Sequence, residues 1–225
     1  MKSLLFVFPL MACFLLSFSP AKKKMRVVFF GDSITEAGVQ PGGYIAQMRD
    51  TLVAENKGEA FDLVGAGISG NKVYDLYLRL ETDVLAKKPK VVVIYVGVND
   101  VWHKQTHGTG TDADKFKKFY DAIIAKLQKK GIQVIMCTPA CIGEKKGGVN
   151  PLDKELDTYS DIIRGIAKEK NCKLVDLRKA FTEYNAANNI SDRYSSILTT
   201  DGVHLNAKGN KMVAEMILAA MEEMK

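Results

Sequence analysis

Residues 25–35 read Met-Arg-Val-Val-Phe-Phe-Gly-Asp-Ser-Ile-Thr, a pattern that indicates an α/β fold. The first six residues form a short apolar run rich in β-branched and aromatic side chains, which is typical of a buried strand. The run stops at Gly31, and Asp32 and Ser33 follow in a turn that the glycine initiates. In α/β proteins, reactive groups lie at the carboxyl ends of buried strands. Ser33 is therefore a candidate nucleophile.

Apolar runs and amphipathic segments alternate along the rest of the chain. Further strands are expected at residues 61–64, 91–96, 133–136 and 173–176. Helices are expected at residues 43–55, 73–85, 152–168, 178–187 and 207–223, and a capping box at residues 111–114 is expected to open another that ends near residue 129. Residues 91–96 are apolar throughout, as in a central parallel strand with both faces covered. Because parallel strands need crossover helices, the sequence predicts a three-layer α/β/α sandwich with about five parallel strands.

The composition fits one globular domain, which we expect at residues 22–225. The chain has 225 residues, 47% of them hydrophobic, and no linker rich in Pro, Ser or Gly divides it. The formal net charge is +6, and lysine pairs scattered along the chain carry it. A nucleic-acid-binding surface would need a basic stripe interleaved with aromatic residues, which the sequence lacks, so no nucleic-acid partner is expected.

Residues 1–21 are expected to be a secretory signal peptide. Lys2 precedes an apolar stretch at residues 4–18, and Ser19-Pro20-Ala21 offers a cleavage pattern of small residues. The apolar stretch is shorter than the roughly 20 residues of a transmembrane helix, so no stable membrane insertion is expected after cleavage. We expect a periplasmic or secreted protein. A lipid anchor on Cys13, which follows a loosely lipoprotein-like sequence, or an uncleaved membrane anchor are the alternatives.

Three cysteines would remain after cleavage: Cys137, Cys141 and Cys172. An odd number cannot form a complete disulfide framework, and their pairing is not predicted. Buried free thiols are favoured, and a bridge between Cys137 and Cys141 would be strained by the short loop. No spacing typical of a metal site is present, so no metal is expected.

Ser33 needs a general base, because a serine hydroxyl is a weak nucleophile on its own. His204 lies near the end of the chain, and Asp201 precedes it by three residues. At this spacing the carboxylate can reach one ring nitrogen while the other faces the cleft. We predict Ser33 as nucleophile, His204 as base and Asp201 as the carboxylate that orients it.

Acyl transfer also needs hydrogen-bond donors for the oxyanion that forms on the substrate carbonyl. The backbone N–H groups of Ser33 and Gly70 and the side-chain amide of Asn99 follow three predicted strands. Gly70 and Asn99 could each be a simple turn residue. Their combination with Ser33 and His204 favours the donor role.

Five further residues lie near the predicted catalytic ones. Asp32 and Asp100 are expected to support the catalytic loops. Trp102 and His103 follow Asp100 in an expected loop at the cleft, where the tryptophan could stack on a sugar or simply anchor the loop. His107 lies in the same loop, but no further ligand is spaced to form a metal site with it and His103.

The predicted catalytic residues and oxyanion donors fall in four short blocks that resemble those of the SGNH hydrolases, also called GDSL lipases/esterases. The blocks, in chain order, are residues 31–34, 67–71, 97–100 and 201–204. The residues in the family name match Ser33, Gly70, Asn99 and His204, and Ile34 replaces the leucine of the first block. The resemblance implies a flavodoxin-like α/β/α fold, a shallow, solvent-open cleft and no cofactor.

The expected function is hydrolysis of carboxylic esters with a short acyl group, because the predicted loops are short and include no lid-like apolar insert. An exported member of this family and size looks like an O-acetylesterase that acts on carbohydrate. The alternatives are a lysophospholipase or thioesterase and a catalytically silent module that binds glycan or lipid. The silent module is disfavoured because a binder has no need of Asp201 behind His204. The expected partner is a small-molecule or polysaccharide ester, while acyl length, alcohol and oligomeric state are not predicted.

Overall fold

The computed structural model describes residues 24–224. The expected signal peptide, Cys13 and the start of the expected domain lie outside the described residues. Among residues 24–224, no helix combines the length and apolar character that a membrane span requires.

Five parallel strands form one sheet with the order β2-β1-β3-β4-β5, which confirms the predicted fold class. The strands are β1 (Met25–Gly31), β2 (Phe61–Gly67), β3 (Val91–Tyr95), β4 (Gln133–Cys137) and β5 (Lys173–Val175). Every residue of β3 is buried, as expected for a central strand covered on both faces.

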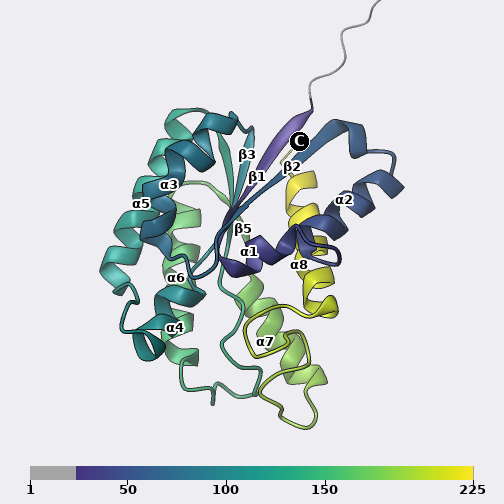
Figure 1. Ribbon diagram of the computed structural model, residues 1–225. Helices are drawn as coiled ribbons and strands as arrows, with labels where there is room; N and C mark the ends of the chain where they lie inside the picture. The colour runs from purple at the N-terminus through teal and green to yellow at the C-terminus, as the bar shows by residue number, and fades with distance from the viewer. Residues whose placement is uncertain (1–23, 225) are drawn as a thin grey trace, which may run out of the picture.

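Helices cover both faces of the sheet (Figure 1). The longer helices are α2 (Tyr44–Ala54), α3 (Val73–Asp83), α5 (Ala113–Lys129), α6 (Asp153–Glu169), α7 (Leu177–Asn188) and α8 (Ala207–Glu222). Helices α3, α5 and α6 lie together on one face, and α2 and α8 lie together on the other. In α5 the buried positions recur every three or four residues, at Phe116, Tyr120, Ile123, Ile124 and Leu127. This period gives the helix one apolar stripe toward the sheet.

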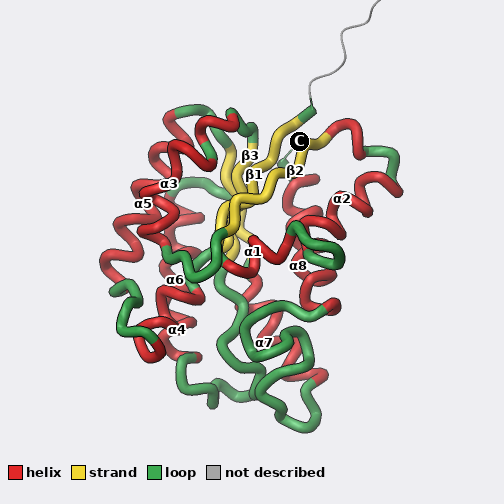
Figure 2. The backbone as a smooth tube through the Cα atoms, viewed as in Figure 1, coloured by secondary structure: helices red, strands yellow, loops and turns green. Residues whose placement is uncertain are grey.

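The strand order changes direction between β1 and β3, where parallel α/β sheets bind their ligands. The two strands end level with each other, because Gly31 pairs with Tyr95. On its other side Gly31 pairs with Gly67, so β2 ends at the same height. The segments after β1 and β3, which carry Ser33 and Asn99, therefore start at the same edge of the sheet. The loops after β4 and α7 also extend beyond this end (Figure 2).

Two short helices and one helix start differ from the predictions. Ser33–Gly38 forms α1 and Val98–Thr106 forms α4, so Trp102 and His103 lie on a helix and not in the expected loop. The predicted capping box at residues 111–114 was also wrong. Helix α5 begins at Ala113 after Asp112, whose side chain makes no capping hydrogen bond. The remaining connections include two short 3-10 turns, Gly58–Ala60 and Leu85–Lys87.

Candidate active site

Ser33 is the first residue of α1, and only Asp32 separates it from the end of β1. The carboxylate of Asp32 caps this helix by accepting a hydrogen bond from the backbone N–H of Ile34 at 3.0 Å. Gly31 must lack a side chain, because a Cβ there would lie 2.3 Å from the carbonyl oxygen of Tyr95. The tight turn and the cap together fix Ser33 at the carboxyl edge of the sheet.

Ser33, His204 and Asp201 lie in one hydrogen-bonded row. Ser33 Oγ is 3.0 Å from His204 Nε2, and His204 Nδ1 is 2.7 Å from Asp201 Oδ2. The other carboxylate oxygen of Asp201 accepts the backbone N–H groups of Val203 and His204, at 2.9 and 2.8 Å. With the Nδ1 proton donated to Asp201, Nε2 is free to accept the proton of Ser33.

The row is open to solvent. The side chains of His204 and Asp201 are 39% and 49% exposed. Partial burial raises the pKa of Asp201, but the hydrogen bonds from the His204 ring and from two backbone N–H groups outweigh this and lower the pKa below its usual value. Asp201 is therefore ionised at neutral pH, as a carboxylate that orients and stabilises an imidazolium must be.

Gly70 and Asn99 face the same edge of the sheet. Gly70 has φ +77, a left-handed conformation that favours glycine. Asn99 is buried in the first turn of α4, and its side-chain nitrogen donates one hydrogen bond to the carbonyl of Asn71, at 3.1 Å. An amide nitrogen carries two hydrogens, so one donor of Asn99 remains for a ligand.

Asp100 is fully buried and holds the start of α3. Its two carboxylate oxygens lie 3.1 and 3.3 Å from the backbone nitrogen of Val73, which donates to them. Burial raises the pKa of Asp100 to about 7, and burial likewise raises the pKa of Asp32 to about 7. Asp32 thus holds the start of α1, which carries Ser33, and Asp100 holds the start of α3, which follows the loop that carries Gly70.

The raised pKa of Asp100 makes stability depend on pH. Between about pH 4 and pH 7 the native carboxyl keeps a proton that the unfolded chain releases, so the native state loses stability as pH rises through this range. We expect the free energy of unfolding of Asp100→Asn, relative to the parent, to increase across this range by an amount on the order of a few kcal/mol and then level off. Urea unfolding at a series of pH values measures the difference, and a difference that does not change with pH would contradict the expectation.

Trp102 and His103 follow Asn99 along α4. His103 Cε1 would lie 3.9 Å from a Cβ added to Gly70, so the imidazole borders the proposed donor glycine. Partial burial, the Lys72 ammonium and His107 lower the pKa of His103, so the ring is neutral at neutral pH. The rings of Trp102 and His103 are 5.8 Å apart. Of the predicted substrate-binding pair, His103 therefore lies beside Gly70, whereas Trp102 is partly buried and packs against the hydrophobic core.

Glu144 is a supporting residue that the sequence analysis missed. Its buried carboxylate accepts the backbone N–H groups of Ile197, Leu198 and Thr199, at 2.9, 2.6 and 3.0 Å. Thr199 Oγ1 in turn accepts the backbone N–H of Gly202 at 3.0 Å. Glu144 thereby anchors the segment that leads into Asp201 and His204. In the sequence it lies among lysines and glycines and gives no such signal.

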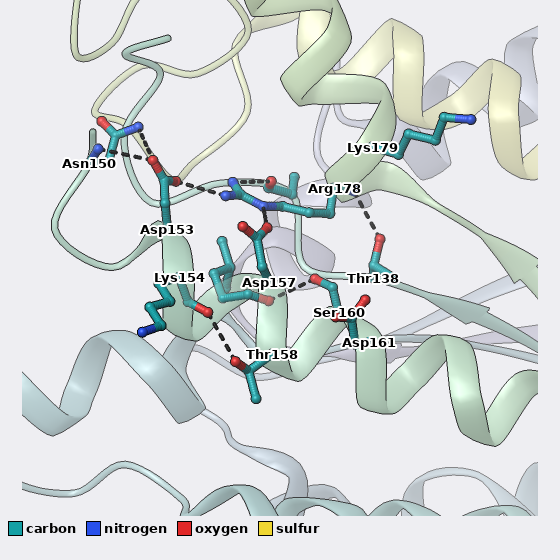
Figure 3. A network of polar contacts seen from close by, with 12 residues as sticks. Thr138, Asn150, Asp153, Lys154, Asp157, Thr158, Ser160, Asp161, Arg178 and Lys179 are labelled. Carbon is teal, nitrogen blue, oxygen red and sulfur yellow. Dashed lines mark hydrogen bonds and ion pairs between the residues drawn. The ribbon is translucent and has the colours of Figure 1, made fainter. Parts of the chain in front are cut away.

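Arg178 on α7 bonds to α6 and to Thr138, which lies at the start of the loop after β4 (Figure 3). Its guanidinium donates to Asp157 at 2.6 Å and to Asp153 at 2.8 Å, which ties α7 to α6. Its backbone N–H donates to Thr138 Oγ1 at 2.9 Å, at the start of the same loop. A buried, doubly paired arginine of this kind fixes the relative placement of two helices and a loop.

The cysteines Cys137, Cys141 and Cys172 are free thiols in the structure, so the strained bridge between the first two does not form. Burial raises the pKa of each thiol, that of Cys172 to about 11, which makes them poor nucleophiles. Within residues 24–224, no cluster of three or more His, Cys, Asp or Glu side chains is arranged to hold a metal ion.

Several known proteins with similar sequences and structures are esterases. The GDSL-like lipase/acylhydrolase family matches residues 29–212. An acetylxylan esterase of Geobacillus stearothermophilus is 31% identical over 210 residues, which are 86% of this chain and 92% of that protein. The crystal structure of an acetyl xylan esterase, AlAXEase, has 57% identity and a TM-score of 0.86, and covers 87% of this chain and 98% of that one. An uncharacterized lipoprotein of Bacillus subtilis, YqeF, is 29% identical over 85% of this chain and 87% of its own length.

The family match and the fold agree with the four sequence blocks, and the predicted resemblance is confirmed. The match includes the strand-end segments that carry Ser33, Gly70, Asn99 and His204. The chain belongs to the GDSL-like lipase/acylhydrolase family and is a carboxylic ester hydrolase.

Proposed function

We propose that this protein is an O-acetylesterase that removes acetyl groups from a polysaccharide such as xylan, with Ser33 as its nucleophile. The observation that carries the proposal is the row from Ser33 Oγ to His204 and Asp201, joined at 3.0 and 2.7 Å and open to solvent. The similarity to acetylxylan esterases over most of both chains supports the substrate class.

In the first half of the reaction, His204 Nε2 takes the Ser33 proton as Ser33 Oγ bonds to the ester carbonyl carbon. Asp201 holds the ring and stabilises the imidazolium. The C–O bond to the sugar then breaks, and His204 gives its proton to the leaving sugar oxygen. The product is acetyl-Ser33. In the second half, water attacks the acetyl carbon and gives a proton to His204, which passes it to Ser33 Oγ as the bond between the acetyl carbon and Oγ breaks, so that acetate and the Ser33 hydroxyl are released.

The negative charge on the carbonyl oxygen is held by the backbone N–H groups of Ser33 and Gly70 and by the Asn99 amide. Each such donor contributes roughly 3 kcal/mol to lowering the barrier. Asn99 is already fixed by its bond to Asn71, so its free N–H need not reorganise during the reaction. Preorganised donors are more effective than solvent for this reason.

The openness of the site supports a polymeric substrate, because a polysaccharide can reach Ser33 only where the surrounding chain leaves the row uncovered. Neutral His103, beside Gly70, offers a hydrogen-bonding ring for a sugar next to the acetyl group, and the partly buried Trp102, whose ring centre lies 5.8 Å from that of His103, offers an aromatic surface.

The expected substrate preference can be measured with p-nitrophenyl esters of increasing acyl length, followed by acetate release from acetylated xylan. We expect kcat/KM to be highest for the acetate and to fall by about tenfold or more at octanoate, since one misfit methylene costs on the order of 1 kcal/mol or more. Acetate should be released from acetylated xylan. Chemically deacetylated xylan is the matched control.

Other outcomes identify the alternatives. A preference for octanoate would contradict the proposal and favour a lysophospholipase or thioesterase. Absence of turnover on every ester would favour a silent binding module. Turnover of p-nitrophenyl acetate without acetate release from any acetylated polysaccharide would keep the esterase chemistry and overturn the carbohydrate substrate.

We further propose that the protein is exported and that its signal peptide is cleaved between Ala21 and Lys22. The lipoprotein among its relatives makes attachment through Cys13 the competing outcome. Intact mass and N-terminal sequencing of the protein from its native cells distinguish the two, because a chain that begins at Lys22 supports cleavage and one that begins at Cys13 contradicts it.

A further inference from the structure

Arg79 lies on α3 and points its guanidinium into the junction of β1 and β2. The side chain is only 13% exposed, and its guanidinium carbon lies 4.5 Å from the centre of the Phe30 ring. On an amphipathic helix, a charged side chain usually faces water. A buried guanidinium needs several partners to offset the loss of water.

This guanidinium donates four hydrogen bonds of 2.7 to 2.9 Å. Nη2 donates to the carbonyl of Gly31, the last residue of β1, and Nη1 donates to the carbonyl of Ala66 near the end of β2. Nε donates to the side-chain oxygen of Asn71, and Nη1 also bonds to Asp83. Three of the four acceptors thus belong to the segments that lead into Ser33 and surround Gly70.

One of these acceptor residues, Asn71, also bonds to Asn99. The carbonyl of Asn71 accepts the Asn99 amide at 3.1 Å, while the side chain of Asn71 accepts Arg79 at 2.7 Å. The carbonyl of Gly31 accepts the backbone N–H of Ile68 as well as Arg79. One planar group therefore bonds directly to the segments that carry Ser33 and Gly70, and Asn71 links it to Asn99.

We propose that Arg79 is the positioning residue that sets the spacing of the three oxyanion donors. The inference rests on the donor roles proposed above for Ser33, Gly70 and Asn99. Donors act only when they lie about 3 Å from the developing oxyanion, and a misplacement of about 1 Å costs on the order of 100-fold in rate. The rigid fork of an arginine can hold several carbonyls at fixed separations, which the single ammonium of a lysine cannot do.

A role in stability alone would not need this arrangement. The ion pair with Asp83, four residues along the same helix, involves only α3. The three remaining hydrogen bonds all reach acceptors at the carboxyl ends of β1 and β2 or in the loop after β2. A positioning role thus accounts for contacts that an ion pair within the helix leaves unexplained.

The test compares kcat and KM of Arg79→Met, Arg79→Lys and Asn71→Ala on p-nitrophenyl acetate, well below each variant's Tm. We expect kcat of Arg79→Met to fall by about 100-fold while KM changes by less than about threefold. Arg79→Lys keeps the charge and should recover less than about a tenth of the lost kcat. In the Asn71→Ala variant, the further change Arg79→Met should lower kcat by a smaller factor than Arg79→Met does in the parent, because the two side chains act through one contact.

Arg164→Met is the matched control. Arg164 is likewise a partly buried helix arginine with several side-chain bonds. It forms two 2.8 Å bonds to the Asp176 carboxylate and an ion pair with Asp161, so none of these side-chain bonds reaches the three donor segments. It should lower Tm without changing kcat by more than about twofold.

The inference is overturned if kcat of Arg79→Met stays within about threefold of the parent, if Arg164→Met loses as much kcat, or if Arg79→Lys restores full activity. Failure of the proposed catalytic assignment is visible separately, as retained activity of Ser33→Ala in the same assay. An inactive Ser33→Ala together with a fully active Arg79→Met overturns the positioning role alone.

Discussion

Replacing Ser33 with alanine is expected to lower kcat/KM for p-nitrophenyl acetate by roughly 10⁵- to 10⁶-fold. The change removes the oxygen that bonds to the carbonyl carbon, and the donors that remain can only assist direct attack by water. Steady-state kinetics at substrate concentrations around KM measures the loss. Each preparation should be checked for traces of the parent enzyme, which would set a false floor.

The same substitution should leave the fold intact. Ser33 Oγ makes its side-chain hydrogen bond to His204, across a solvent-open site. The free energy of unfolding should therefore change by less than about 1 kcal/mol, as urea denaturation can show. Activity of Ser33→Ala within tenfold of the parent would place the nucleophile elsewhere.

Asp201→Asn is expected to lower kcat by about 10⁴-fold. The carboxylate accepts the Nδ1 proton of His204 at 2.7 Å, which leaves Nε2 free to accept the proton of Ser33. An asparagine amide nitrogen facing Nδ1 would donate, which moves the ring proton to Nε2 and prevents it from acting as the base. The amide oxygen could still accept the backbone N–H groups of Val203 and His204, so the loop geometry should persist.

Asp161→Asn is the matched control for this variant, because Asp161 also pairs with a basic side chain, that of Arg164, but lies outside the site. It should keep the parent kcat. A loss of less than tenfold in Asp201→Asn would show that His204 is oriented by another group.

The strands were predictable because their sequence signal is local. Residues 91–96 are apolar at every position, and the structure makes five of them the fully buried strand β3. Helices α1 and α4 were not predicted because each is short and depends on contacts made by the fold. Helix α1 has six residues and relies on the Asp32 cap. Helix α4 has nine residues, and its buried Asp100 bonds to the start of α3.

The candidate site could be predicted only where residue type and chain order carry the chemistry. Ser33, Asp201 and His204 have such a signal, and the structure brings them into one row. Arg79 and Glu144 have none, because a long charged side chain on a helix or in a glycine-rich segment looks like a solvated one. Their partners are backbone groups of segments far away in the sequence, which only the folded chain places together.

The central claim is that Ser33 forms the covalent acyl-enzyme, and labelling with an alkyl fluorophosphonate tests it most directly. Ser33 Oγ should displace fluoride and form a phosphonyl ester, which peptide mass spectrometry locates. We predict one label per chain, on the peptide that contains Ser33, and no label in Ser33→Ala under the same conditions. A label on any other residue, or equal labelling of Ser33→Ala, would contradict the account.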